Sequence, residues 1–365
     1  MILISRIILH WDNLVLSDEI TLEVSQQVFL SIILPARNEA ENIAKCLQAV
    51  QNQDYPATLL EIIVIDDQST DDTANIISTQ FKNVKLLSMQ HPDGSNGSKK
   101  QALSKGIAVA KGKLIVCLDA DCVPSSDKWL TTMVSCLIAN RMLAVTGPVK
   151  YTSDATIWQN FQAIENAGMM VITGVGHQSA WFQMANGGNM CFYKSVFDAV
   201  NGFEGNAHLA SGDDMFLFEK IHQLSPLRTG FVKNEEAIVE TSPIPDFQGY
   251  IQQRIRWGTK NSRLQSFKLK GILSLVWIEN LFVVMAIVSI PFIYNLRIQL
   301  TSVVLILLKF MLDFGLLKCG AVFLKQVPTL KRYWISALMY PFLLVFTGIL
   351  SIFKTDYTWK GRKVK

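Results

Sequence analysis

Two carboxylates, Asp119 and Asp121, directly follow an apolar run at residues 114–118. An unbroken apolar run that closes at a turn is typical of a buried strand, and ligands of open α/β sheets bind beyond the carboxyl ends of the strands. Carboxylates at such a place suit a hard divalent cation that keeps some water and shares the phosphates of a substrate. Short acidic pairs are also common in loops and helix caps, so the rest of the chain must decide.

A second acidic pair, Asp66 and Asp67, ends the apolar run of residues 60–65. These carboxylates can accept hydrogen bonds from the N–H groups of a nucleotide base or from ribose hydroxyls. The residues that follow, Thr70 and Asp71, equally suit helix capping. Capping explains part of this segment, but not the acidic pair itself.

The turn that contains Pro35, Arg37 and Glu39 leads from an apolar run into a helical pattern. The free N–H groups at a helix start favour anions, although an ordinary strand-turn-helix corner explains the same residues. A third acidic pair, Asp213 and Asp214, precedes an amphipathic stretch. The pair could simply interact favourably with the positive end of the helix dipole, or it could supply a general base for an acceptor hydroxyl.

The last polar motif contains Gln253, Arg256 and Trp257. Its arginine can bind a diphosphate and its tryptophan can stack on a ring. Basic and aromatic residues ahead of an apolar segment also serve as membrane-interface anchors.

The elements that must position these residues alternate in type between residues 30 and 150. Apolar runs predict strands and amphipathic patterns predict helices, which together indicate an α/β fold with a doubly wound, largely parallel sheet. The predicted strands are residues 30–35, 60–65, 84–88 and 114–118, and the predicted helices are residues 39–51, a helix from 71, and 99–110. Residues 151–260 are less regular and are interpreted as the second half of the same domain.

Half of the 365 residues are hydrophobic, and the excess lies after residue 271. Residues 272–294, 300–324 and 333–353 are each long enough for a transmembrane helix. Lys309 and Asp313 lie on one helical face, where a structural ion pair is expected. The net charge of +4 is too small to indicate nucleic acid. The six cysteines include no CxxC pair, so buried reduced thiols are expected.

Three complete spans conflict with the charge of the tail. With the globular part in the cytoplasm, they would place the tail outside, although basic segments tend to stay inside. One stretch could therefore lie in the interface, and Glu279 and Asn280 favour the first. The basic residues of the tail are Lys354, Lys360, Arg362, Lys363 and Lys365.

In their order and spacing, the motifs resemble the inverting family 2 glycosyltransferases with the GT-A fold. The likeness is to the membrane-attached branch, which includes cellulose and hyaluronan synthases and ceramide glucosyltransferase. It covers roughly residues 30–262, and several ordered motifs make coincidence improbable. The positions that carry it are Pro35, Arg37, Glu39, Asp66, Asp67, Lys99, Asp119, Asp121, Asp213, Asp214, Gln253, Arg256 and Trp257.

The resemblance implies three regions: an N-terminal extension at residues 1–29 that could lie at an interface, a GT-A catalytic domain with a doubly wound mixed sheet at residues 30–262, and a membrane region at residues 263–365 with about three apolar helices and a basic tail. It also implies a multi-pass protein of the cell membrane whose catalytic domain is cytoplasmic. The expected partners are a nucleotide-sugar, most simply a UDP-sugar, a lipid or glycan acceptor and the membrane, with no nucleic acid.

The resemblance also implies roles for the motif residues. Asp66 and Asp67 would contact the base and ribose, with Lys99 nearby, and Asp214 would be the catalytic base. Asp121, with Asp119 assisting, would hold Mg²⁺ or Mn²⁺ on the diphosphate. The remaining substrate-binding positions are Pro35, Arg37, Glu39, Asp213, Gln253, Arg256 and Trp257.

Other functions remain open at this point. The last motif is often associated with processive polysaccharide synthases, although few spans leave little material for a channel. A catalytically silent membrane scaffold would keep the fold without the chemistry. A nucleotidyltransferase would need a Gly-rich phosphate loop after the first strand, and the turn there has no glycine. Asp213 departs from the family pattern, because the motif reads Gly-Asp-Asp rather than Thr-Glu-Asp.

Overall fold

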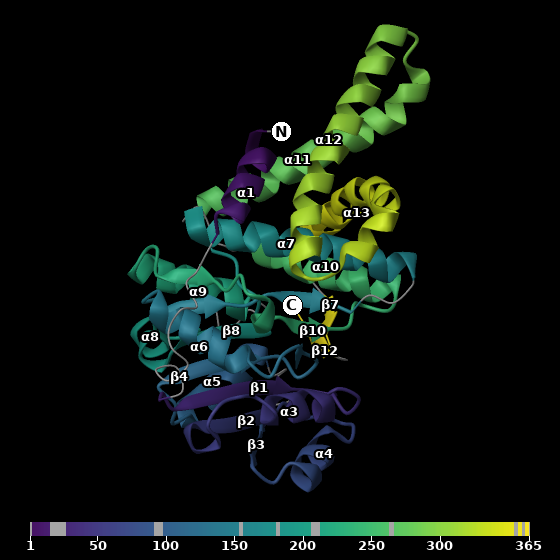
Figure 1. The fold of residues 1–365 in the computed structure, drawn as a ribbon. Helices are drawn as coiled ribbons and strands as arrows, with labels where there is room; N and C mark the ends of the chain where they lie inside the picture. Colours follow the sequence, from purple (N-terminus) through teal and green to yellow (C-terminus); the bar gives the residue numbers. More distant parts are fainter. Residues whose placement is uncertain are drawn as a thin grey trace. The chain divides into compact units, whose positions relative to one another are not determined.

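The computed structural model describes residues 2–14, 27–90, 98–152, 156–179, 183–205, 212–262, 266–353, 357–359 and 362–364. The chain divides into two compact units (Figure 1). The sheet unit consists of Leu14–Tyr151, Gly176–Ser242 and Thr358–Lys365, and the helical unit of Met1–Asn13, Thr152–Val175 and Pro243–Tyr357. Two segments of the predicted 30–262 domain therefore belong to the helical unit. The limits of the functional domains stay a prediction.

The main sheet has seven strands in the order β3-β2-β1-β4-β8-β6-β9. The first four strands of this order are parallel, β8 runs antiparallel to both of its neighbours, and β6 and β9 are parallel. The predicted α/β fold with a mixed sheet is confirmed. The strands are β1 (Leu30–Ala36), β2 (Leu60–Asp66), β3 (Val84–Ser88), β4 (Leu114–Leu118), β6 (Ala144–Thr146), β8 (Asn189–Tyr193) and β9 (Thr229–Phe231).

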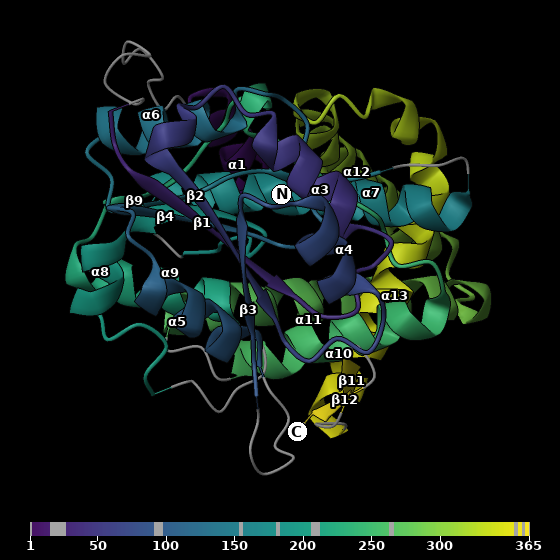
Figure 2. The same cartoon turned by 90° about the horizontal axis from the view of Figure 1, so that it is seen from below.

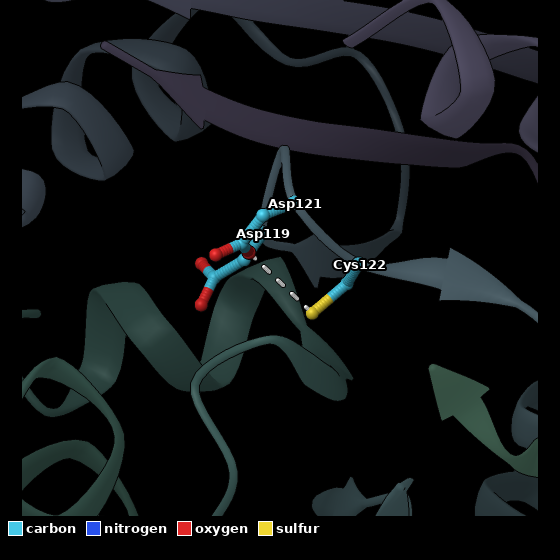
Figure 3. A group of neighbouring side chains, drawn as sticks. All are labelled: Asp119, Asp121 and Cys122. Carbon is cyan, nitrogen blue, oxygen red and sulfur yellow. Dashed lines mark hydrogen bonds between the residues drawn. The ribbon is translucent and has the colours of Figure 1, made fainter. Parts of the chain in front are cut away.

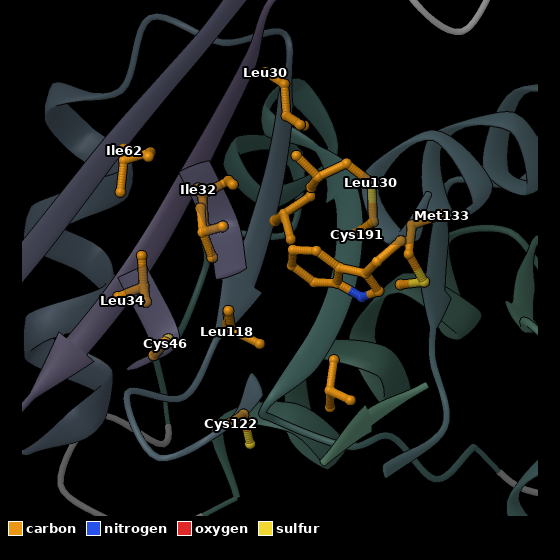
Figure 4. Packing of buried hydrophobic residues seen from close by; sticks show 14 of the residues in the cluster. Leu30, Ile32, Leu34, Cys46, Ile62, Leu118, Cys122, Leu130, Met133 and Cys191 are labelled. Carbon is orange, nitrogen blue, oxygen red and sulfur yellow. The ribbon is translucent and has the colours of Figure 1, made fainter. Parts of the chain in front are cut away.

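Helices cover both faces of this sheet, which is why its central strands are apolar throughout. Successive side chains of a strand point to opposite faces. Ile32 and Leu34 accordingly pack with helices α3 (Ile43–Gln51) and α6 (Trp129–Ala139), as Figure 4 shows for part of this core. Ile33 lies on the other face, in the core formed with α5 (Lys99–Val109) and α9 (Asp213–Leu224).

Smaller elements complete the sheet unit. A three-stranded sheet has the order β5-β10-β7, and β11 pairs with β12. The bounds are α4 (Thr73–Gln80), β5 (Val123–Pro124), β7 (Val149–Tyr151), α8 (Lys194–Ala199), β10 (Val239–Thr241), β11 (Tyr357–Trp359) and β12 (Arg362–Val364), with the short 3₁₀ helices η1 (Ala57–Leu59) and η2 (Glu235–Ala237). The sequence also predicts a polar loop at residues 91–98, of which only Ser98 lies among the described residues. Figure 2 shows the same chain from below.

The helical unit contains three helices long and apolar enough to cross a membrane, as the sequence predicts. Two of them, α11 and α12, expose large apolar side chains along their lengths, as lipid-facing helices do. The elements of this unit are α1 (Ile2–Asp12), α7 (Ile157–Ser179), α10 (Phe247–Ser262), α11 (Phe267–Ser289), η3 (Ile290–Phe292), α12 (Leu296–Phe323), η4 (Val327–Arg332) and α13 (Tyr333–Phe353).

A polar contact joins α11 to α12 near their midpoints. Lys309 Nζ lies 2.5 Å from Asp313 Oδ2 and donates to Asn280 Oδ1 at 3.4 Å. The expected Lys309–Asp313 pair is therefore present. Asn280 is buried against this pair, so a polar residue that seemed unfavourable for a span has a partner on the neighbouring helix.

Candidate active site

The carboxyl ends of β1, β2 and β4 meet at one edge of the main sheet, because these strands are parallel neighbours. Asp66 ends β2, and Asp119 follows β4. The antiparallel strand β8 begins at this same edge, since Asn189 pairs with Leu118. The segment that precedes β8 is thereby brought to the acidic residues that follow β4.

Asp119, Asp121 and Cys122 form a compact group in which the possible ligand atoms lie within 4.8 Å of one another (Figure 3). The Cys122 thiol lies 3.7 Å from Asp121 Oδ1 and donates to it. The pKa of Asp121 is raised to about 6, mainly because the surrounding chain partly desolvates the carboxylate and secondly because Asp119 repels its charge. Burial raises the pKa of the Cys122 thiol well above its usual value, so the two carboxylates are the hard ligands of this group.

Lys99 connects this group to the third acidic pair. Its Nζ lies 2.6 Å from Asp119 Oδ1 and 3.1 Å from Asp213 Oδ2. Burial alone would lower the pKa of Lys99, but Asp119 and Asp213 outweigh that effect and hold the pKa well above its usual value. The ammonium is therefore a fixed positive charge between two acidic motifs.

Asp213 and Asp214 open α9 after Gly212, whose φ of 82° lies in the left-handed region that favours glycine. Their side chains have different surroundings. Asp213 is buried beside Lys99. Asp214 is half-buried, and its Oδ2 and Oδ1 accept hydrogen bonds from the backbone N–H groups of Gly187 (3.2 Å) and Met215 (2.7 Å).

Two glycines pass close to both acidic motifs. A Cβ on Gly187 would lie 3.0 Å from both Lys99 Nζ and Asp213 Oδ2. A Cβ on Gly188 would lie 3.1 Å from Asp119 Oδ2. Residues 186–189 thus form one wall of the acidic site. Their backbone approaches so closely because Gly187 and Gly188 carry no side chains.

The second acidic pair lies in a pair of interlinked loops. Asp66 Oδ1 accepts a hydrogen bond from the Ser69 N–H at 3.2 Å. Arg37 donates to the Asp67 carbonyl at 2.5 Å, and the N–H of the buried Glu39 donates to the Thr73 hydroxyl oxygen at 2.8 Å. The predicted residues Arg37 and Glu39 therefore hold the two loops together, while Pro35 lies near the end of β1.

Asp71 contacts the first residue of α4, but the N-cap position is Asp72, whose side chain makes no capping hydrogen bond. Asp71 accepts hydrogen bonds from the Thr73 N–H and hydroxyl and from the Ala40 N–H. Although partial desolvation raises its pKa, these hydrogen bonds outweigh that effect, so the pKa of Asp71 is lowered.

Sequence comparison agrees with this geometry. Residues 31–199, which include β1 to β4, the first two acidic pairs and Gly187–Gly188, match the family described as Glycosyl transferase family 2. These residues form a glycosyl transferase family 2 domain. The resemblance inferred from the ordered motifs is thereby confirmed at the level of the family.

Two curated relatives and one solved structure illustrate the likeness. Glycosyltransferase AglE of Haloferax volcanii is 31% identical over 192 residues, which are 51% of this chain and 59% of AglE. A dolichyl N-acetyl-alpha-D-glucosaminyl phosphate 3-beta-D-2,3-diacetamido-2,3-dideoxy-beta-D-glucuronosyltransferase of Methanococcus voltae is 36% identical over 106 residues, 27% of this chain and 31% of that protein. The chain thus spans less than two thirds of either relative.

The solved structure is the mannosyltransferase PcManGT from Pyrobaculum calidifontis, in complex with GDP-Man and Mn²⁺. It has a TM-score of 0.57 and 19% identity, and the match covers 95% of this chain and 94% of PcManGT. At this identity the likeness concerns the fold, and it supports the GT-A architecture of this chain.

The last motif lies on α10, which belongs to the helical unit, whereas the acidic residues belong to the sheet unit. Within this motif, Arg254 pairs with Glu165 of α7, a residue that the sequence analysis did not single out. Glu165 Oε2 lies 2.5 Å from Arg254 Nη2. The Arg254 guanidinium also stacks over Tyr250 (4.6 Å) and Trp257 (4.3 Å). Burial raises the pKa of Glu165, although Arg254 opposes that shift.

The stack on α10 changes how the motif is interpreted. One face of Trp257 is covered by Arg254, while Gln253 and Arg256 are half-buried. No sequence signal singles out Glu165, because it is an ordinary acidic residue in an apolar helical pattern. Only the packing of α7 against α10 reveals it.

Proposed function

We propose that this protein is an inverting, metal-dependent glycosyltransferase. It would move a sugar from a nucleoside-diphosphate sugar, most simply a UDP-sugar, to a hydroxyl of a lipid or lipid-linked glycan at a membrane. The observation that carries the proposal is the convergence of Asp119, Asp121, Asp213 and Asp214 on Lys99 and on the Gly187–Gly188 backbone. Inversion comes from the family resemblance.

The acidic group fits a hard cation such as Mg²⁺ or Mn²⁺. Asp119 and Asp121 offer carboxylate oxygens within 4.8 Å of each other, and such ions take their remaining ligands from water and substrate phosphates. When bound, the cation would offset the charge that develops on the leaving diphosphate. Asp66 and Asp67, at the end of β2 on the same edge of the sheet, would contact the base and ribose.

Asp214 is the proposed general base, and its two backbone hydrogen bonds would keep its carboxylate in place. The acceptor oxygen would attack the anomeric carbon, the bond from that carbon to the diphosphate oxygen would break with its electron pair, and the hydroxyl proton would pass to Asp214. A positioned base contributes typically about 10²–10⁴ in rate. Asp213, paired with Lys99, has the charge of a base but a more buried position.

The membrane part supports the choice of acceptor. Three helices are long and apolar enough to span a bilayer, and the name of the Methanococcus voltae relative describes a dolichyl-linked sugar phosphate as acceptor. A lipid-linked acceptor at the membrane is the simplest explanation of both observations. Gln253, Arg256 and Trp257 would serve the diphosphate and acceptor side, and the sheet unit would be cytoplasmic.

The test is a panel of nucleotide-sugars offered to the detergent-purified full chain, together with a lipid extract as acceptor. Release of nucleoside diphosphate and formation of a glycosylated lipid are scored with Mn²⁺, with Mg²⁺ and with EDTA. We expect one donor class to react, with a single sugar added, and the reaction to stop in EDTA. Product chains of many sugars would support a processive synthase instead.

Failure of every donor, with metal and acceptor present, would support the silent-scaffold interpretation. Turnover that persists in EDTA would remove the metal from the proposal. A variant with Asp198→Asn is the matched control, because Asp198 is an exposed aspartate on α8 outside the acidic group.

A further inference from the structure

Lys99 occupies an unusual position for a lysine. It is the first residue of α5, whose start is fixed by a capping box between Ser98 and Gln101. The N-terminus of a helix carries partial positive charge, so a cation there is disfavoured. The side chain is nevertheless only 16% exposed and is turned toward the acidic residues. The position of Lys99 is therefore explained by its contacts with the acidic residues and not by the stability of the helix.

The ammonium and a divalent cation would share the same carboxylate. Lys99 Nζ lies 2.6 Å from Asp119 Oδ1, and Asp119 is one of the two carboxylates that fit the cation. The other oxygen of Asp119 faces the backbone of Gly188, at 3.1 Å from where a Cβ would stand. A cation on Asp119 would thus lie close to a fixed positive charge, which disfavours its binding.

Lys99 also has little room to withdraw. The Lys99 ammonium lies 3.1 Å from Asp213 Oδ2. The Gly187 backbone limits its movement, since a Cβ on Gly187 would lie 3.0 Å from Lys99 Nζ. The charge therefore remains in the site when Asp119 is taken by another cation. It keeps Asp213 as a partner but loses Asp119, and a diphosphate beside the cation is an anion that can replace Asp119.

We propose that Lys99 couples the binding of the divalent cation to the binding of the nucleoside diphosphate. Its ammonium opposes the cation at Asp119 until a diphosphate brings negative charge for both. The cation alone then binds weakly, and cation and diphosphate bind tightly together. Linkage requires the coupling to be reciprocal. This role rests on the proposed function, because it assumes a diphosphate donor.

The test measures binding rather than turnover. Purified full-length protein is titrated with Mn²⁺, free Mn²⁺ is followed by electron paramagnetic resonance, and the titration is repeated with saturating UDP or GDP. For the unchanged protein, one nucleotide should tighten Mn²⁺ binding by a factor within about 5–150, the usual range of coupling between sites. Lys99→Gln should bind Mn²⁺ alone about tenfold more tightly and lose most of that coupling.

Two further variants complete the design. Lys99→Arg keeps the charge and should keep the coupling. Lys105→Gln removes a lysine from the same helix, where its Nζ donates to the Ser88 carbonyl at 2.7 Å, and should bind Mn²⁺ like the unchanged protein. Damage to the fold would weaken Mn²⁺ binding, so tighter binding in Lys99→Gln cannot arise from misfolding.

Unchanged or weaker binding of Mn²⁺ alone by Lys99→Gln overturns the proposal. If that result occurs while the unchanged protein binds Mn²⁺ and a nucleotide, the proposed function stands and only the role of Lys99 is lost. If the unchanged protein binds neither Mn²⁺ nor UDP nor GDP, the proposed function is lost together with it.

Discussion

At the scale of single residues, Asp213 and Asp214 have opposite surroundings although they are neighbours in the chain. Asp213 is buried and paired with Lys99, whereas Asp214 is half-buried and held by backbone N–H groups. A base must accept a proton from a group that reaches it. Asp214 fits that requirement better, because its carboxylate is half-buried whereas Asp213 is buried beside Lys99.

Asp214→Asn should reduce transfer by about 10²–10⁴, because a positioned base contributes that much. Binding of Mn²⁺ and nucleotide should change little, since the amide keeps the shape of the side chain. Turnover is measured with the donor found in the panel, and nucleotide binding by calorimetry. Near-normal turnover in this variant, with Asp198→Asn as reference, would exclude Asp214 as the base.

His177 is a buried histidine whose ring nitrogens contact the Thr229 hydroxyl (3.2 Å) and the Met184 carbonyl (2.6 Å). Desolvation by burial lowers its pKa to about 4. A lowered pKa means that the folded state resists protonation, so stability is complete above about pH 6.5 and is lost as the pH falls toward 4.

Between pH 7 and pH 5, His177 should therefore cost the folded state about 2 kcal/mol. The free energy of unfolding is compared at the two pH values for the unchanged protein and for His177→Asn, in which this part of the pH dependence should vanish. His10→Asn, which changes an exposed histidine of α1, is the control. Equal pH dependence in all three proteins would contradict the assignment.

At the scale of elements, α7 and α12 approach each other unusually closely. A Cβ on Gly320 would lie 2.1 Å from the Ala167 carbonyl oxygen, and a Cβ on Gly168 would lie 2.6 Å from Leu317. Small residues permit such backbone approach between apolar helices. The backbone atom at Ala167 cannot turn aside, so these two helices must separate to accept a side chain at Gly320.

Gly320→Ala should consequently destabilise the protein by about 1–3 kcal/mol, the usual cost of overpacking. Gly271→Ala on α11 is the matched control, because a Cβ there meets nothing within 4 Å; it should be neutral or stabilising by up to about 1 kcal/mol. Thermal unfolding in detergent compares the two. Equal melting temperatures would show that α7 and α12 are not packed in this way.

At the scale of the whole molecule, the chain returns to the sheet unit after the apolar helices. Pro243–Tyr357 belongs to the helical unit, and Thr358–Lys365 to the sheet unit. If the sheet unit lies on one side of a membrane, the number of complete crossings between these segments is even. That arrangement keeps the basic tail inside, in agreement with the usual charge distribution.

If one of the three helices does not cross, we expect it to be α13. One side of α13 is buried and includes Tyr333, Ala337 and Val345. The large apolar side chains at other positions of α13 are exposed. The sequence favours the first stretch for this role because of Glu279 and Asn280. Within the helical unit, however, Asn280 contacts Lys309 of α12, so one of the two residues that argued against α11 as a span has a partner.

Single cysteines at Tyr294, Lys331 and Lys363 test this arrangement with a membrane-impermeant maleimide. With a cytoplasmic sheet unit, Tyr294→Cys in the α11–α12 connection should react in intact cells. Lys331→Cys and Lys363→Cys should react only after permeabilisation. The unchanged protein is the control, since five of its six cysteines are buried. Reaction of Lys363→Cys in intact cells would indicate three complete crossings.

The sequence by itself determined the local elements and the position of each acidic motif. Apolar runs predict β1, β2, β3 and β4 with nearly the observed bounds, because burial on both faces leaves a continuous apolar signal. The carboxylates of Asp66 and Asp119 stand where those runs end, so their place at one edge of a parallel sheet follows from local pattern alone.

Only the tertiary structure decided what these residues meet. The antiparallel course of β8 brings Gly187 and Gly188 to the acids, Lys99 joins Asp119 to Asp213, and Glu165 holds Arg254. Each contact joins segments far apart in the chain and depends on strand direction or helix packing. Strand direction and helix packing depend on how the whole chain buries its apolar surface, and no local pattern encodes that.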